Sequence, residues 1–155
     1  MLQRMLLLSS ILVLQIDAAL AQKTVTALKT EDKPQIEDIT GYHSTQDKTN
    51  NLELRVLEAD TSVDVARNPV VLFLVITDNG PGNDAQTYVW RLPMEVSEVT
   101  GLSAAKSLLK ISAVVDDVMD QKTGRFPTRK ETINVTYSMA KGKLSNRIAV
   151  ATSSP

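Results

Sequence analysis

Few residues of this chain are of the types that perform acid–base or nucleophilic chemistry. His43 is the only histidine, cysteine is absent, and Ser44 follows His43 directly. A Ser-His-carboxylate triad needs a hydroxyl within hydrogen-bond distance of the imidazole, and neighbours along a chain do not generally face each other. One imidazole without any thiolate also disfavours a transition-metal site. We therefore predict that His43 belongs to a polar loop, and we assign no catalytic residue.

Aspartates offer the remaining candidate chemistry. The segment Asp78–Asp84 and the group Asp116, Asp117 and Asp120 each bring several carboxylates close together in the sequence. Carboxylate oxygens bind hard cations such as calcium, but neither group has the ligand spacing of a known calcium loop. The Asp, Asn, Gly and Pro residues of the first segment equally suit a tight turn. We predict that both segments form turns and bind no metal or cofactor. If the chain were a hydrolase, these carboxylates would have to serve as its catalytic groups.

Two motifs have both a functional and a structural interpretation. Tyr88 and Trp90 share a face of a predicted strand and, if exposed, would stack on a sugar or a protein partner. Because the chain has one Trp, three Tyr and two Phe, we assign both residues to the core. Asn134 starts a glycosylation sequon on the predicted solvent face of a strand, and its use depends on the host. No phosphate-binding loop or basic run with aromatics supports nucleotide or nucleic-acid binding.

The segment 1–21 has the pattern of a cleavable secretory signal. Arg4 precedes an apolar stretch, which is followed by small residues at Ala19 and Ala21. The apolar stretch is shorter than the roughly 20 residues that cross a bilayer as a helix. We expect a secreted or periplasmic protein that begins at Gln22 and has no membrane segment after cleavage.

Composition narrows the class of protein further. The formal net charge is -1, so there is no electrostatic signature of binding to nucleic acid or to an anionic membrane. Small exported domains commonly depend on disulfides, and a chain without cysteine must be held together by packing alone. Its length suits one domain with its own core.

Periodicity predicts a series of strands after an extended arm. Segment 22–51 is interpreted as that arm, with a short edge strand near its start and a polar loop anchored by Ile36, Ile39 and Tyr42. Alternation then predicts a strand from Leu52. A strand buried on both faces is predicted at 70–77, with a return strand at 88–92 that Pro93 ends, and further strands at 132–139 and 144–152. The tail 153–155 is predicted to be frayed.

Residues 103–122 fit two periodicities. As a helix, the segment places apolar residues at spacings of three and four, with Ser103 and Gly124 where caps belong. As a strand, it alternates around Ile111 and has a Val-rich centre. The sequence favours the strand slightly, because every other well-patterned element is a strand.

These elements predict a mainly β fold, an immunoglobulin-like β-sandwich of about seven strands over residues 52–152. The favoured function is an exported, non-catalytic module that binds a protein or cell-surface partner. One alternative is an extracellular hydrolase that is carboxylate-based or calcium-dependent. The other is a subunit of a surface assembly whose arm adds a strand to a neighbour.

Overall fold

The computed structural model describes residues 22–29, 39–60, 69–79 and 85–154. The predicted signal segment, Ile36 and Asp84 lie outside these ranges. The described part is mainly β and contains no helix. Its strands are β1 (Lys23–Thr26), β2 (Ile39–Asp47), β3 (Leu52–Asp60), β4 (Val70–Asp78), β5 (Gln86–Val96), β6 (Glu98–Ala105), β7 (Leu108–Asp116), β8 (Thr128–Thr136), β9 (Met139–Ala140), β10 (Lys143–Leu144) and β11 (Arg147–Ser153). None of the described residues forms a helix long and apolar enough to cross a membrane.

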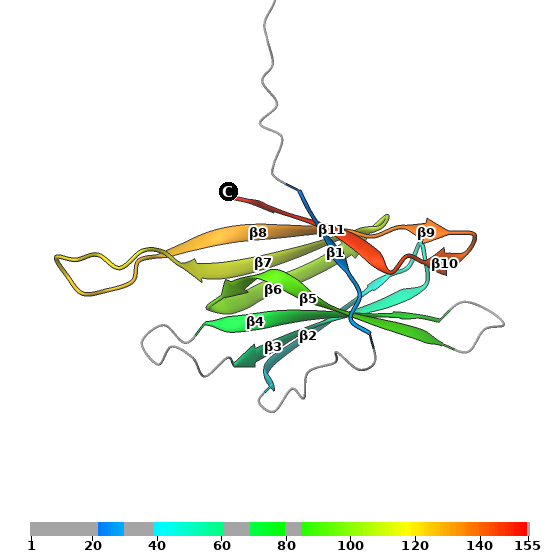
Figure 1. Cartoon of the computed structure of the whole chain (residues 1–155), viewed down its shortest axis with the longest axis horizontal. Coiled ribbons are helices and arrows are strands. Elements are labelled where there is room, and N and C mark those ends of the chain that lie inside the picture. Colours follow the sequence, from blue (N-terminus) through cyan, green and yellow to red (C-terminus); the bar gives the residue numbers. More distant parts are fainter. Residues whose placement is uncertain (1–21, 30–38, 61–68, 80–84, 155) are drawn as a thin grey trace, which may run out of the picture.

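Two antiparallel sheets form the two layers seen in Figure 1. One has the order β1-β11-β8-β7-β6, the other has the order β2-β3-β4-β5, and β9 and β10 form a separate ribbon. Neighbouring strands follow chain order except where β1 joins β11, and the two-stranded ribbon interrupts the chain between β8 and β11. This is a meander, so the Greek-key connections of an immunoglobulin-like sandwich are not confirmed. The region predicted as the sandwich contributes seven strands to the two sheets, β3 to β8 and β11, which agrees with the expected number; β1 and β2 of the arm add two more.

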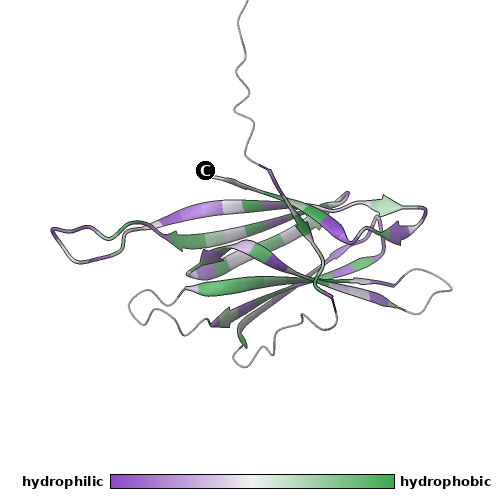
Figure 2. Cartoon of the chain, viewed as in Figure 1, coloured by the Kyte–Doolittle hydropathy of each residue, from purple (hydrophilic) through white to green (hydrophobic). Residues whose placement is uncertain are grey.

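A single main core lies between the sheets, because alternate residues of both point inward. It includes Leu54 and Val56 from β3, Trp90 from β5, Ile111 from β7 and Ile133 from β8. The prediction that β4 is buried on both faces is confirmed. Its outward residues Val71 and Phe73 belong to a second apolar cluster with Ala59. Figure 2 shows β4 as apolar along most of its length.

The segment 103–122 is neither one strand nor a helix. Residues 103–105 end β6, a turn follows at Lys106 and Ser107, and β7 occupies Leu108–Asp116. The strand interpretation is correct for β7, whose Leu109, Ile111 and Ala113 are buried. Both turn residues have positive φ angles, 50° for Lys106 and 65° for Ser107. Glycine or asparagine usually occupies such positions, so the hairpin had no recognisable turn sequence.

The predicted polar loop in the arm is partly wrong. Its second half is β2, which pairs antiparallel with β3 along its length. Ile39 and Tyr42 are exposed rather than anchored. The predicted edge strand near the start is confirmed as β1, which pairs with β11. Ser153, assigned to the frayed tail, belongs to β11.

Pro93 does not end the return strand, because β5 continues to Val96. The ladder between β4 and β5 instead shifts register there. Phe73 pairs with Arg91 and Val71 pairs with Glu95, so the three residues 92–94 face Leu72 alone. Proline lacks an N–H and is tolerated in a strand at such a bulge. The bulge bends β5 just before the one-residue connection, Ser97, to β6.

Candidate functional site

His43 lies on the inner face of β2, where its register partner is the core residue Val56. Its Nε2 atom is 2.6 Å from Oε1 of Glu58 on β3. Ser44 is exposed and points to the opposite face, so the two neighbours cannot form a catalytic pair. The prediction that His43 is a loop residue is wrong, and its partner is a carboxylate that the sequence had not singled out.

Glu58 is buried at the end of the sandwich, between the two sheets. Its second oxygen, Oε2, accepts the backbone N–H of Val99 on β6 at 3.1 Å. Gly41 faces this carboxylate across the β2–β3 ladder, and a Cβ atom there would overlap Oε1 of Glu58. The sequence did contain a signal. Glu58 follows Leu54 and Val56 at the same even spacing, which places a carboxylate on the apolar face of its strand.

These residues line an open cavity of about 490 Å³, which we call the corner pocket. It lies where the start of β2, the end of β3 and the start of β6 meet. Tyr42 stands at its rim with 57% of its surface exposed, and neighbouring Ile39 is 53% exposed. Asp60 and Glu98 also line the pocket. The corner pocket is therefore acidic, with exposed apolar side chains beside it.

The His43–Glu58 pair could orient an imidazole, as carboxylates do in hydrolases. A nucleophile would also have to lie within hydrogen-bond distance of the imidazole. Within the described residues, the only side-chain hydrogen bond of His43 is the one to Glu58. The Ser97 hydroxyl in the pocket wall is fully buried and has no hydrogen-bond partner. The geometry fixes a side chain in a pocket without presenting a nucleophile to it.

A second buried carboxylate, Asp47, lies at the opposite end of β2. Its Oδ2 atom accepts hydrogen bonds from the Tyr137 hydroxyl at 2.7 Å, the Asn50 amide at 2.6 Å and the Ser107 N–H at 3.1 Å. Its Oδ1 atom accepts the Thr49 N–H at 3.0 Å. We call this network the Asp47 junction. It connects β2 to the β6–β7 turn and to the end of β8, so it joins the two sheets.

The hydrogen bonds of the junction set the charge state of Asp47. Burial alone would raise the pKa of this carboxyl group. The donors Tyr137, Asn50, Ser107 and Thr49 outweigh burial and lower the pKa to about 2. Burial and the bond to Asp47 in turn raise the pKa of the Tyr137 hydroxyl. The junction is an ionised, fully bonded carboxylate rather than a proton donor.

The aspartates considered for calcium or catalysis do not converge. Asp78 ends β4, opposite Leu52, whereas Asp116 ends β7 at the other end of the sandwich. Asp117 is 3.2 Å from the Arg129 guanidinium and caps the Val118 N–H. Asp120 accepts the Lys122 N–H and the Thr123 hydroxyl within a turn. Within the described ranges, no group of acidic and imidazole side chains has the arrangement of a metal site.

The aromatic pair and the glycosylation sequon are the remaining candidates, and their side chains contact other parts of the fold. Trp90 is completely buried, and its indole N–H donates to the Asn146 carbonyl at 3.1 Å. Tyr88 lies against it, with ring centroids 5.8 Å apart, so the assignment to the core is confirmed for Trp90, while Tyr88 is partly buried against that core. Asn134 is half-buried on β8, and its amide donates to the Ser153 hydroxyl at 3.4 Å.

Comparison of the chain with family models, with curated proteins and with solved structures gives no match.

Proposed function

We propose that this chain is an exported, non-catalytic β-sandwich module that binds a protein or cell-surface partner through the rim of the corner pocket. The proposed export to a secreted or periplasmic location depends on the signal pattern of residues 1–21. An intact mass of the exported protein that matches a chain starting at Gln22 supports this location. An exported protein that keeps Met1 contradicts it.

The observation that carries this proposal is the position of the exposed apolar side chains. Four large apolar residues are exposed in the described part of the chain, and two of them, Ile39 and Tyr42, lie on the same end of β2. Tyr42 lines the corner pocket, and Ile39 directly precedes Thr40, which also lines it. Aromatic side chains at the edge of a concave site are the typical anchors of protein interfaces. The acidic pocket beside them favours a partner with basic groups.

The hydrolase alternative has less support in this geometry. Its candidate carboxylates Asp78 and Asp116 lie at opposite ends of the sandwich. An enzyme of this type needs two carboxyl groups within a few ångströms of one reacting bond. The strand-addition alternative needs an arm without a partner in its own chain. Both described strands of the arm, β1 and β2, pair with strands of this chain.

Affinity capture from the surface fraction of the host tests the proposed interface. Wild-type protein is compared with the double variant Ile39→Ser and Tyr42→Ser, and with the control Thr24→Ala on exposed β1. We expect one protein or polymer that binds saturably to wild type and to the control, and whose affinity for the double variant falls by a factor of ten or more, about 1.4 kcal/mol. Equal affinity for all three proteins contradicts the proposed interface.

A turnover assay tests the non-catalytic part separately. We expect no hydrolysis of ester, peptide, phosphate or glycoside substrates, and no change in the thermal midpoint after chelation. Turnover that is lost in Asp116→Asn or His43→Ala would contradict the proposal, provided that the variant keeps its thermal midpoint. A midpoint lowered by more than about 5 °C on chelation would instead indicate a structural calcium ion.

A further inference from the structure

The bulge in β5 opens a gap between β4 and β5. Residues 92–94 have no register partner on β4 other than Leu72, and Pro93 cannot donate a hydrogen bond to a ladder. The resulting cavity measures about 460 Å³ and is distinct from the corner pocket in its lining. That volume falls within the range of small-molecule sites in proteins, about 300 to 1,000 Å³.

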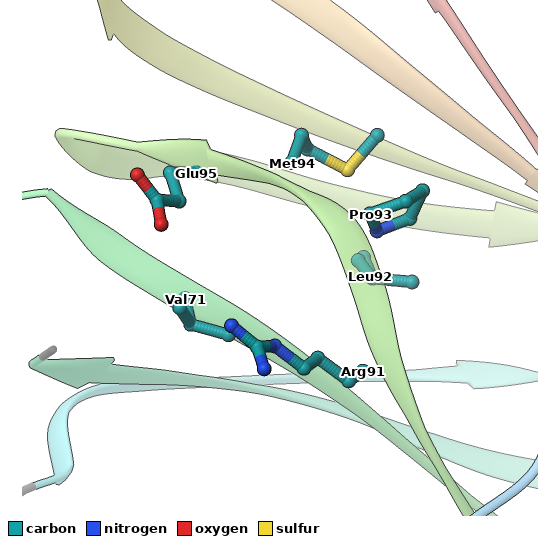
Figure 3. Close-up of a pocket in the computed structure, with 6 residues that line it drawn as sticks. All are labelled: Val71, Arg91, Leu92, Pro93, Met94 and Glu95. Atoms are coloured by element: carbon teal, nitrogen blue, oxygen red, sulfur yellow. The ribbon is translucent and has the colours of Figure 1, made fainter.

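Two opposite charges flank this gap. Arg91 and Glu95 are both exposed and lie on the outer face of the sheet, opposite Phe73 and Val71 in the register. Figure 3 shows the guanidinium of Arg91 and the carboxylate of Glu95 directed toward the gap from opposite ends. Within the described part of the chain, neither side chain forms an ion pair.

The surface between the two charges is apolar. Val71 lies beside the guanidinium of Arg91 (Figure 3), and the other apolar lining residues are Leu92, Pro93 and Met94 of β5. Val71 is 4% exposed, so it is already held in place by the second apolar cluster. The gap therefore offers an anion-binding group and a cation-binding group on β5, with apolar lining residues from β4 and β5.

From this arrangement we infer that the gap binds a zwitterionic ligand with an apolar body, of the class of apolar dipeptides with free ends. The carboxylate of the ligand would pair with Arg91, since a guanidinium binds carboxylates through two parallel hydrogen bonds. The ammonium group would pair with Glu95. The two residues are four positions apart on a bulged strand, and an extended strand rises about 3.3 Å per residue. This spacing suits the separated charges of a dipeptide better than those of a free amino acid.

The test measures the binding of leucyl-leucine to the purified protein by calorimetry and by amide chemical shifts. Two ligands with one blocked end, the N-acetyl form and the C-terminal amide, and free leucine complete the series. We expect shifts at Val71 and at residues 91–95. We also expect leucyl-leucine to bind about tenfold tighter than either blocked ligand, and tighter than leucine.

Variants then assign each end of the ligand. In Arg91→Gln, the preference for the free carboxylate over the amide disappears while the preference for the free ammonium remains. In Glu95→Gln, the preference for the free ammonium is expected to disappear while the preference for the free carboxylate remains. The control Arg147→Gln, an exposed arginine on β11, keeps both preferences. Because each variant is judged by its ratio between ligands, a loss of folded protein does not imitate the result.

Three results would overturn the inference: no binding of leucyl-leucine, no preference for free ends, or the same loss of preference in Arg147→Gln. Tighter binding of leucine than of leucyl-leucine would contradict the assigned ligand size. The inference is independent of the proposed partner interface, because Ile39→Ser with Tyr42→Ser leaves the gap intact and is expected to keep dipeptide binding.

Discussion

Asp47 and Glu58 are the two buried acidic residues of the described chain, and they lie at opposite ends of the side where β2 adjoins β6. Asp47 accepts hydrogen bonds from four groups, three of them on one oxygen. Glu58 accepts two at its carboxylate, from His43 and Val99, beside an open pocket. The same type of side chain therefore closes one end of the sandwich and borders a cavity at the other.

The difference shows how a polar edge strand can join two sheets without apolar packing. The inner face of β2 carries Gly41, His43, Thr45 and Asp47, whereas the inner face of its neighbour β3 is apolar apart from Glu58. A buried carboxylate is stable only when its hydrogen bonds are made. The hydrogen bonds to both oxygens of Asp47 hold that end of the sandwich rigid. The Glu58 carboxylate accepts fewer hydrogen bonds and therefore leaves room for a ligand.

The largest effect is expected for Asp47→Ala. The Tyr137 hydroxyl and the Ser107 and Thr49 N–H groups would lose their acceptor, and buried donors without partners are costly. We expect the free energy of unfolding to fall by about 3 kcal/mol or more, measured by urea denaturation. The control Glu98→Ala removes an exposed carboxylate and should change it by less than about 0.5 kcal/mol. Similar losses in both variants would contradict a special role for the Asp47 junction.

Acid should weaken the same junction. The pKa of Asp47 is lowered in the folded protein to about 2, from 3.8. Its ionised form therefore stabilises the fold above the unfolded pKa, and this stability is lost as the pH falls through the folded value. We expect Asp47 to account for about 2 kcal/mol of the loss between about pH 4 and pH 2. In Asp47→Asn that component should be missing, and an unchanged acid dependence would contradict the assignment.

A moderate effect is expected for Gly41→Ala at the other end. The added methyl group would displace the Glu58 carboxylate from His43 and Val99, because it overlaps Oε1. We expect a loss of about 1–2 kcal/mol in the free energy of unfolding, smaller than for Asp47→Ala. Gly101→Ala is the control, since its Cβ would lie 3.6 Å from the Ser112 Cβ, an ordinary contact. Equal stability of the two alanine variants would show that Glu58 relocates freely.

The smallest effect is expected for Tyr42→Ser at the rim of the corner pocket. The ring is mostly exposed, so the free energy of unfolding should change by less than about 0.5 kcal/mol. A larger loss, measured by the same denaturation, would mean that Tyr42 supports the fold and is not available to a partner.

Sequence periodicity predicted those elements whose inner face is mostly apolar. The strands β3, β4, β7 and β11 were recognised because Leu54, Leu72, Ile111 and Val150 alternate with outward residues or lie in continuous apolar runs. In β2 the inward residues are polar, so its period carries no hydrophobic signal. The polar inner face of β2 can be buried only because Glu58 bonds to His43 and several donors bond to Asp47. Those hydrogen bonds that join residues far apart in the sequence form only in the folded chain.

The candidate site was less predictable than the fold. His43 was noticed because it is the only histidine, but its partner Glu58 lies 15 residues away on the next strand. Glu58 alternates in phase with the buried residues Leu54 and Val56, so the sequence does indicate that its side chain points inward. The gap beside Pro93 had no such signal, because it depends on the register shift between β4 and β5.

The pairing of β1 with β11 has a consequence for folding kinetics. Thr24 pairs with Ala149, so the five-stranded sheet is completed only when the two ends of the described chain meet. Closing a loop of that length costs on the order of 4 kcal/mol of chain entropy, and β1 supplies only four residues of ladder in return. Further contacts reinforce the closure, namely the Leu28 N–H to the Val89 carbonyl and the Ala27 N–H to the Asn146 carbonyl. β1 should therefore dock late in folding and detach early under stress, uncovering the edge of β11 to another chain.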